Sequence, residues 1–238
     1  MNPIKVLCFE LFGDYAQFRK FFTNMSPLSF SIPPRTALAG IVGAVLGIDK
    51  QVNPEQFTLD NSFFAIRLIN PVKKTKIAHN YLKTGSITNV YNVGEHKPTN
   101  VEFLKDVRYR VYFAHEDQRL YGELKSLLES HQTTYTISLG ISGCLANYNY
   151  IGEFELMPCK SGEALKLDSV VPMASVQDLI MNEPVKLQKV VLPSAMNNQR
   201  EVLRYDEVLY EMNGMSINLI LKTTAYQVGE LQDTIHGI

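Results

Sequence analysis

Residues 29–48, SFSIPPRTALAGIVGAVLGI, limit the possible folds of this chain more than any other segment does. Its Pro33-Pro34 pair predicts an extended corner, because proline locks φ and disfavours helix at the residue before it. The sequence then predicts a helix that Thr36 caps through its hydroxyl and that Gly47 ends in the left-handed conformation. Because the helix interior contains no polar residue, we expect this helix to be buried.

Glycines inside this helix indicate tight packing. Gly40 and Gly43 each cost about 1 kcal/mol relative to Ala in a helix interior, so local propensity does not hold the helix. With Gly47 they fall on one face at positions i, i+3 and i+7. We expect close backbone contact on that face and core packing on the other.

The start of the same helix is a candidate anion site. Its first N–H groups have no partner within the helix, and the helix dipole favours negative charge there. Arg35 lies beside them in the sequence, which indicates a phosphate ligand. A surface salt bridge made by Arg35 is the alternative interpretation.

The composition indicates an ordinary globular protein. A chain of 238 residues with 45% hydrophobic and 20% charged residues is long enough and apolar enough for a globular core. The many Tyr and Phe residues favour a sheet-rich structure. The formal net charge of −1 gives no support to a free-standing nucleic-acid binder unless basic residues are concentrated locally.

The cysteines and the apolar runs point to the cytoplasm. The three cysteines have no CxxC spacing, so reduced thiols are expected. The N-terminus lacks the features of a secretory signal. The longest apolar run covers residues 37–48, which is short of the roughly 20 residues of a membrane span. We therefore expect a soluble cytoplasmic protein with no membrane partner.

The order of expected elements indicates an α+β fold. Strands are predicted at residues 4–12, 62–70, 107–114 and 148–157, with helices at 36–47 and 117–130. This β-α-β-β-α-β order is typical of a ferredoxin-like, or modified RRM, domain. We also expect a break at Gly13-Asp14, an irregular segment or short helix at 15–22, and an additional edge strand or hairpin arm at 133–139. Residues 1–157 would form this domain, and residues 158–238 a smaller, mostly β part.

The insert at residues 72–106 is too long for a simple connection between two strands, which usually takes about two to five residues. The sequence predicts a projecting hairpin there. Six basic residues stand against three acidic ones, a net charge of +3, and three arginines on the flanking strands raise it to +6. The basic residues are Lys73, Lys74, Lys76, Lys83, Lys97 and Lys105, and the arginines are Arg67, Arg108 and Arg110.

Aromatic residues interleave with these cations, namely His79, Tyr81, Tyr91 and His96. Lysines neutralise phosphates and aromatic rings stack on unpaired bases, so the pattern suits single-stranded RNA. A solvated hairpin kept soluble by its lysines is the alternative. The loop at residues 140–143, with Gly140 and Ser142, would present backbone N–H groups to a phosphate, or is simply a turn.

Signals for catalysis are few. The chain has no HExxH, Walker or GxSxG motif, and we predict no catalytic residue, metal or cofactor. A metal-free ribonuclease needs a His or Tyr base and a cation to stabilise charge at the phosphate. Candidates by residue type alone are His79, His115, Tyr15, Tyr81 and Lys76.

Three stretches resemble one family. The family is the CRISPR-associated Cas-five family. Its opening strand resembles FGDYAQFRK, its P-P-R-T-A-L-x-G helix start resembles SIPPRTALAGIVGAVLG, and its glycine loop resembles LGISGCLANYNYIGEFE. The type I-B branch is the most similar. The resemblance covers most of residues 1–157 and implies a repeat-associated protein of modified RRM type with a long "thumb" hairpin between its second and third strands.

The resemblance also implies a function. Such subunits cap the 5′ handle of CRISPR RNA in the Cascade surveillance complex, between the last backbone subunit and the large subunit, and take no small-molecule substrate. By position, Pro34, Arg35 and Thr36 would lie at the handle-binding face. The thumb would contribute Lys73, Lys74, Lys76, His79 and Lys83, and the RNA path would include Arg19, Arg108, Gly140 and Ser142.

The family also contains a catalytic branch. Members in type I-C systems cleave the precursor RNA with a Tyr, Lys and His set. No such set can be placed in this sequence, so the resemblance implies a binder that is not an enzyme. A metal-independent endoribonuclease remains the alternative.

Overall fold

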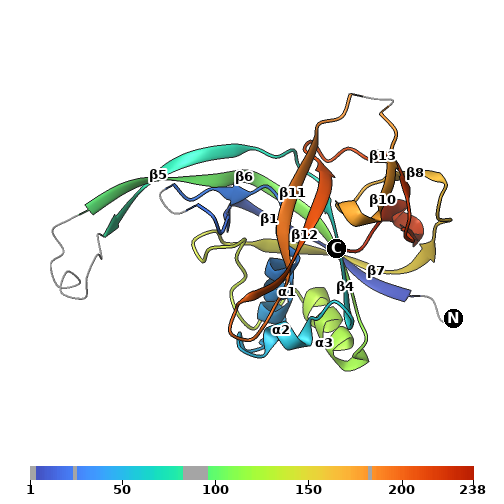
Figure 1. The fold of residues 1–238 in the computed structure, drawn as a ribbon. Helices are drawn as coiled ribbons and strands as arrows, with labels where there is room; N and C mark the ends of the chain where they lie inside the picture. Colours follow the sequence, from blue (N-terminus) through green and yellow to red (C-terminus); the bar gives the residue numbers. More distant parts are fainter. Residues whose placement is uncertain (1–3, 24–25, 83–95, 182–183) are drawn as a thin grey trace.

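The computed structural model describes residues 4–23, 26–82, 96–181 and 184–238 (Figure 1). Within these residues the main element is a seven-stranded antiparallel sheet in the order β15-β14-β7-β1-β6-β4, with β5 paired to the outer part of β6. Its strands are β1 (Ile4–Ala16), β4 (Ser62–Leu68), β5 (Lys74–Leu82), β6 (His96–His115), β7 (Asn147–Pro158), β14 (Tyr226–Val228) and β15 (Asp233–Ile235).

The helices α1 (Arg35–Leu46), α2 (Asn53–Gln56) and α3 (Gln118–Glu129) lie together on one side of this sheet (Figure 1). Along the chain, α1 falls between β1 and β4, and α3 falls between β6 and β7. The buried side of α1 and the sheet face beneath it share one core cluster, which includes Leu38, Val42, Val111 and Phe113. The apolar helix predicted after the proline corner is confirmed.

The C-terminal end of α1 shows why that helix stops. Gly47 has φ 75°, and the N–H of Ile48 donates to the carbonyl of Gly43 at 2.9 Å, which is the predicted left-handed ending. Thr134 and Tyr135 donate their N–H groups to the carbonyls of Val45 and Ala44. The expectation of a strand at residues 133–139 is wrong, because this run is irregular. Its backbone N–H groups instead donate to carbonyls that the helix leaves unpaired.

The first strand is longer than predicted. The expected break at Gly13-Asp14 is wrong, because β1 continues to Ala16 and Gly13 pairs with Val107. A Cβ at Gly13 would lie 2.8 Å from the backbone oxygen of Leu145, so the glycine permits a close approach rather than a turn. Residues 15–22 form no helix; they contain the end of β1 and β2 (Phe18–Arg19), which pairs with β3 (Ser29–Phe30).

The C-terminal part is mostly β. One three-stranded sheet holds β8 (Ala164–Leu167), β10 (Val176–Leu179) and β13 (Ile217–Leu221), and another holds β9 (Val171–Pro172), β11 (Leu187–Met196) and β12 (Val202–Glu211). Short 3₁₀ turns occur at Met173–Ser175 and Gly229–Leu231. Strands β14 and β15 extend the main sheet beyond β7. The division of the chain at residue 157 stays a prediction.

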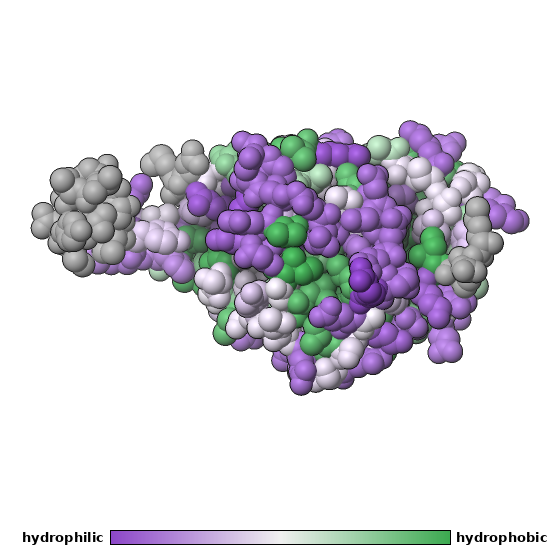
Figure 2. All heavy atoms as spheres, turned by 90° about the horizontal axis from the view of Figure 1, so that it is seen from below, coloured by the Kyte–Doolittle hydropathy of each residue, from purple (hydrophilic) through white to green (hydrophobic). Residues whose placement is uncertain are grey.

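None of the helices in the described ranges is long and apolar enough to cross a membrane. Seen from the side of the helices, the surface is largely hydrophilic around a central apolar patch, and the β5–β6 hairpin extends from the body as a narrow arm (Figure 2).

Candidate nucleic-acid interface

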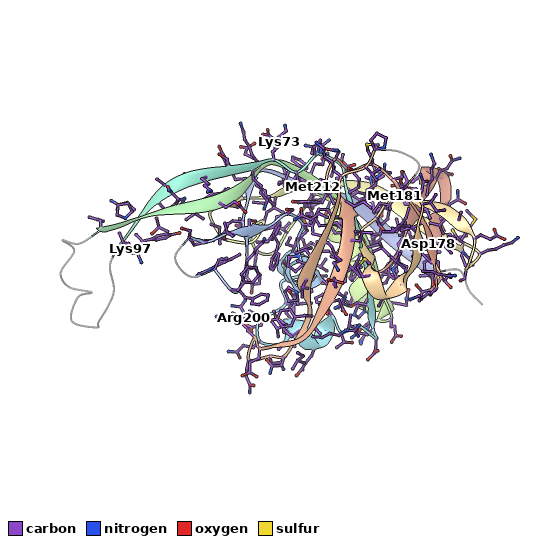
Figure 3. All side chains as sticks on the ribbon, turned by 45° about the horizontal axis from the view of Figure 1, so that its top comes forward. Lys73, Lys97, Asp178, Met181, Arg200 and Met212 are labelled. Carbon is purple, nitrogen blue, oxygen red and sulfur yellow. The ribbon has the colours of Figure 1, made fainter. Side chains whose placement is uncertain are left out.

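The hairpin predicted within residues 72–106 is confirmed for the described residues. Strand β5 pairs with β6 from Lys74 opposite Leu104 out to Leu82 opposite His96, and the pair projects away from the body (Figure 1). Lys73 lies at its base and Lys97 lies toward its outer end (Figure 3). The predicted residues Lys83 and Tyr91 lie outside the described residues.

A row of aromatic rings runs along one face of this hairpin. Tyr15 at the end of β1 meets Phe103 edge-on with ring centroids 6.2 Å apart. Phe103 stacks on His79 at 5.3 Å, and His79 stacks on Tyr81 at 5.8 Å. Tyr81 is 46% exposed and lies opposite Lys97 in the strand pairing. The interleaving of rings and cations expected for His79 and Tyr81 therefore exists on a single face.

The lysines at the base of the hairpin are partly paired with carboxylates. Lys73 contacts Asp106 at 3.4 Å and Lys74 contacts Glu102 at 3.0 Å. Lys74 and Lys76 lie on the face opposite His79, because successive strand residues alternate between faces. Lys74 also donates to the backbone oxygen of Ser29 at 3.4 Å, which places this face beside β2 and β3.

A groove of about 980 Å³ lies along the exposed side of α1. Three cations from distant parts of the sequence line it, together with the single carboxylate of Asp49. Arg200 comes from the turn between β11 and β12, where Figure 3 shows it at the end of that ribbon. The remaining groove residues include Thr36, Ala37, Gly40 and Ala44 of α1 and Tyr135, and the three cations are Arg19, Lys50 and Arg200.

Arg35 does not reach this groove as a free cation. Its side chain is buried, with 3% of the residue exposed, and its guanidinium lies 5.2 Å from the centre of the Phe64 ring. Its terminal nitrogens donate to the Ser62 hydroxyl at 2.8 Å and, at 2.7–3.4 Å, to the carbonyls of Phe57, Thr58, Ser62 and Ser194.

Burial lowers the pKa of Arg35 to about 10, so the group stays charged at neutral pH. The donors on its terminal nitrogens are already used by oxygens of the protein, its buried Nε–H has no partner among the described residues, and only 3% of the residue is exposed. The prediction that Arg35 binds phosphate is therefore wrong. Arg35 instead joins the start of α1 to the loop before β4 and to β11.

The residues next to Arg35 also differ from expectation. Helix α1 begins at Arg35, Pro34 is its extended N-cap residue, and no side chain caps it, so the predicted cap by Thr36 is wrong. The carbonyl of Pro34 accepts from the N–H groups of Ala37 and Leu38 at 2.9 and 3.1 Å. Pro34 is buried, so its predicted RNA contact is wrong too. Thr36 is half-buried and lines the groove.

The arginines flanking the hairpin contribute less free charge than their number suggests. Arg110 contacts Glu10 at 2.8 Å and Asp233 at 2.9 Å, and Arg67 contacts Asp233 at 2.5 Å. Arg108 lies 3.7 Å from Glu10 and packs over an aromatic ring. The charge of +3 that these arginines add to the count is therefore largely compensated by Glu10 of β1 and Asp233 of β15. Arg108, whose side chain is 38% exposed, remains the most accessible of the three.

The glycine loop makes its close approach to the protein itself. Gly140 has φ 95°, and a Cβ there would lie 2.0 Å from the backbone oxygen of Gln17. Gln17 forms a bridge with Gly140 and donates to the carbonyl of Leu139 at 3.0 Å. A glycine is thus required here by the close approach of Gln17, which lies between β1 and β2. Ser142, in the same loop, is exposed.

Several groove residues were not singled out in the sequence. Lys50, Tyr135 and Arg200 lie in polar loops far apart in the chain, and no local pattern distinguishes them from other surface residues. Only the packing of those loops around α1 brings them to one groove.

The candidates for catalysis do not gather into one set. Tyr15, His79 and Tyr81 share the aromatic face of the hairpin, whereas Lys76 lies on the other face. His115 is buried, with one ring nitrogen 2.8 Å from the carbonyl of Gln56 and the other accepting from the backbone of residue 117. Within the described ranges, no group of three or more His, Cys, Asp or Glu side chains is arranged to hold a metal ion.

Comparison with known proteins identifies one family and several proteins of similar fold. The family model described as "CRISPR-associated protein (Cas_Cas5)" matches residues 6–209. A chain of the solved "CRISPR RNA-guided surveillance complex" is similar over 90% of this chain and 91% of its own, with 12% identity and a TM-score of 0.53. A CRISPR protein from Archaeoglobus fulgidus is similar over 98% of both chains, with 13% identity and a TM-score of 0.56. No curated protein matches this chain. The structural similarities show a shared fold of mostly antiparallel sheets with few helices.

Proposed function

Because this chain belongs to the CRISPR-associated Cas5 family, we propose that it is a non-catalytic, RNA-binding subunit of a type I CRISPR surveillance complex that acts in antiviral defence in the cytoplasm. Its ligand is the 5′ handle of the CRISPR RNA, and its neighbours are a backbone subunit and the large subunit. The type I-B assignment rests on the resemblance of the N-terminal motifs. A ferredoxin-like core made of β1, α1, β4, β6, α3 and β7 carries the site.

The observation that carries this proposal is the placement of the cations. Arg19, Lys50 and Arg200 converge on the groove along α1, and the base of the hairpin lies beside β3, where Lys74 reaches Ser29. Cations along a groove neutralise the phosphates of a single strand, and exposed rings stack on its bases. The groove and the ringed face of the hairpin supply these two parts.

Recognition in this scheme is electrostatic and shape-based. The RNA backbone follows the groove across α1, where Gly40 leaves open space with no atom within 4 Å of a Cβ position. The strand then continues along the hairpin, where the exposed ring of Tyr81 and the half-buried ring of His79 stacked on it accept bases. Phosphate contacts position the strand, and the aromatic rings that stack on its bases fix the register of the handle.

The balance of charge supports a subunit that works inside an assembly. The chain as a whole carries a net charge of −1, and its strand arginines are compensated by carboxylates. Long-range attraction to RNA is therefore weak. Protein neighbours that hold the subunit in place make strong attraction unnecessary, because the RNA then binds several subunits at once.

The test uses the purified full chain and repeat RNA in the presence of EDTA. We expect RNA binding without cleavage, weakened by Arg19→Ala and Arg200→Ala and unchanged by Lys160→Ala, a matched change at an exposed lysine outside the groove. Replacing the hairpin between Lys73 and Lys105 with a short turn should reduce assembly of the complex more than any single change. Absence of binding by the wild-type chain would refute the proposal, and one discrete cut would establish the metal-independent endoribonuclease instead.

A further inference from the structure

Three exposed aromatic side chains form a cluster outside the groove and outside the row of rings on the hairpin. Phe21 is 57% exposed, Phe22 63% and Tyr205 42%. The ring of Phe21 lies 5.1 Å from that of Phe22 and 5.0 Å from that of Tyr205, measured between centroids. Phe21 and Phe22 come from the turn after β2, and Tyr205 comes from β12. Two distant segments thus place apolar rings together on the surface.

The turn that carries the two phenylalanines is held without their rings. Lys20 donates its N–H to the carbonyl of Leu28 at 2.9 Å. The Thr23 hydroxyl donates to the carbonyl of Lys20 at 3.0 Å and accepts from the N–H of Leu28 at 3.2 Å. Because this backbone and hydroxyl network shapes the turn, the exposed rings are not explained by local folding. They are available in a defined position for a ligand.

Cations border the cluster. The ammonium of Lys20 lies 5.8 Å from the ring centres of both Phe22 and Phe30. Burial and the nearby charge of Lys74 lower the pKa of Lys20, while Glu102 acts in the opposite direction. Since Glu102 is already paired with Lys74 at 3.0 Å, the border of the cluster favours an anionic ligand. An apolar surface beside positive charge matches a nucleotide, which has an aromatic base and a phosphate.

The position of the cluster links the groove to the base of the hairpin, on the face of the hairpin that carries Lys74. Arg19, the residue before Lys20, lines the groove along α1 and pairs with Ser29. Lys74 at the base of the hairpin donates to the backbone oxygen of the same Ser29. A strand that leaves the groove at Arg19 and continues to the hairpin therefore passes the turn at Phe21 and Phe22.

We propose that Phe21, Phe22 and Tyr205 form a stacking site for one unpaired base of the bound RNA, at the passage from the groove to the hairpin, with Lys20 contacting the adjacent phosphate. This inference rests on the proposed function and adds a base-binding subsite to it. Stacking on aromatic rings tolerates any base, so the site fixes the path of the strand rather than its sequence.

The test uses the full chain and single-stranded repeat RNA of about 12 nucleotides, with 2-aminopurine placed at each position in turn. The fluorescence of one position should be quenched on binding. Phe22→Ala should weaken binding about 5- to 150-fold, which is the range measured when a base loses its aromatic partner. Phe22→Tyr, which keeps a ring, should restore it. Met181→Ala is the control: this residue is 63% exposed and lies on the side of the molecule away from the hairpin (Figure 3).

A second probe separates stacking from charge. RNA that is abasic at the quenched position should bind wild type and Phe22→Ala equally. If Phe22→Ala and Phe21→Ala bind base-containing RNA as tightly as wild type does, the stacking site is refuted while the proposed function stands. If those variants bind RNA normally but lose a protein subunit from the purified complex, the cluster is a protein interface. If wild type binds no RNA, the proposed function fails and this inference with it.

Discussion

Replacing Arg35 separates a structural role from an RNA-binding role. The side chain of Arg35 donates to four carbonyls and one hydroxyl at 2.7–3.4 Å. In Arg35→Met the side chain keeps much of its length and loses every donor. The carbonyls that it served, in the loop before β4 and in β11, would then face an apolar group.

The expected magnitude follows from these contacts. A hydrogen bond to a charged group contributes about 1.5–3 kcal/mol, but removing a buried charge also recovers its desolvation penalty. We expect a net loss of about 3 kcal/mol in the free energy of unfolding, which is a large share of the roughly 5–15 kcal/mol of a typical domain. For a chain of this length that corresponds to a fall in Tm of about 6–12 °C.

Urea unfolding followed by tyrosine fluorescence and circular dichroism measures this loss. Arg19→Met is the matched control: Arg19 is exposed, and the same change there should alter stability by less than about 0.5 kcal/mol. Our reasoning is refuted if Arg35→Met unfolds with the stability of wild type. It is also refuted if a fully stable Arg35→Met protein loses RNA binding, because Arg35 would then reach the RNA directly.

Three further changes test other parts of the structure. Gly140→Ala should lower the free energy of unfolding by about 1–3 kcal/mol, because φ is 95° and a Cβ would lie 2.0 Å from a backbone oxygen. Gly143→Ala, with open space around it, should leave the Tm unchanged when both variants are unfolded by heat, and equal Tm values for the two variants would contradict this. Asp233→Asn should cost about 2–3 kcal/mol, since it removes one carboxylate from each of two partly buried arginines and leaves them only Glu10 and Asp168. The exposed Asp178→Asn should cost nothing, and equal urea midpoints for the two variants would contradict this. Arg19→Ala should reduce the slope of log K against log salt for single-stranded RNA by about 0.7, and an unchanged slope would remove this residue from the groove contacts.

Features that depend on nearby residues were predictable. The apolar run after the proline corner and the glycine at its end were sufficient to predict α1 and its left-handed ending. The excess length of residues 72–106 was sufficient to predict a projecting hairpin. In each case the cause is local: proline and glycine conformation, the spacing of apolar residues, and the number of residues between two strands.

Features that depend on distant partners were not predictable. Whether Arg35 faces a phosphate or four carbonyls depends on the loop before β4 and on β11, whose Ser194 is 159 residues away in the chain. Gly13 looked like a strand break, but its pairing with β6 and its contact with the loop near Leu145 keep it inside β1. A local pattern cannot show which distant group will arrive.

Local sequence is therefore enough to predict where the chain turns, where it is apolar and which segments are long enough to project, because those properties follow from covalent geometry and from the cost of exposing apolar surface to water. Which charges remain accessible depends instead on how distant segments pack together. A guanidinium is a surface cation or an internal donor according to whether backbone oxygens surround it, and that is settled only when α1, the loop before β4 and β11 pack together.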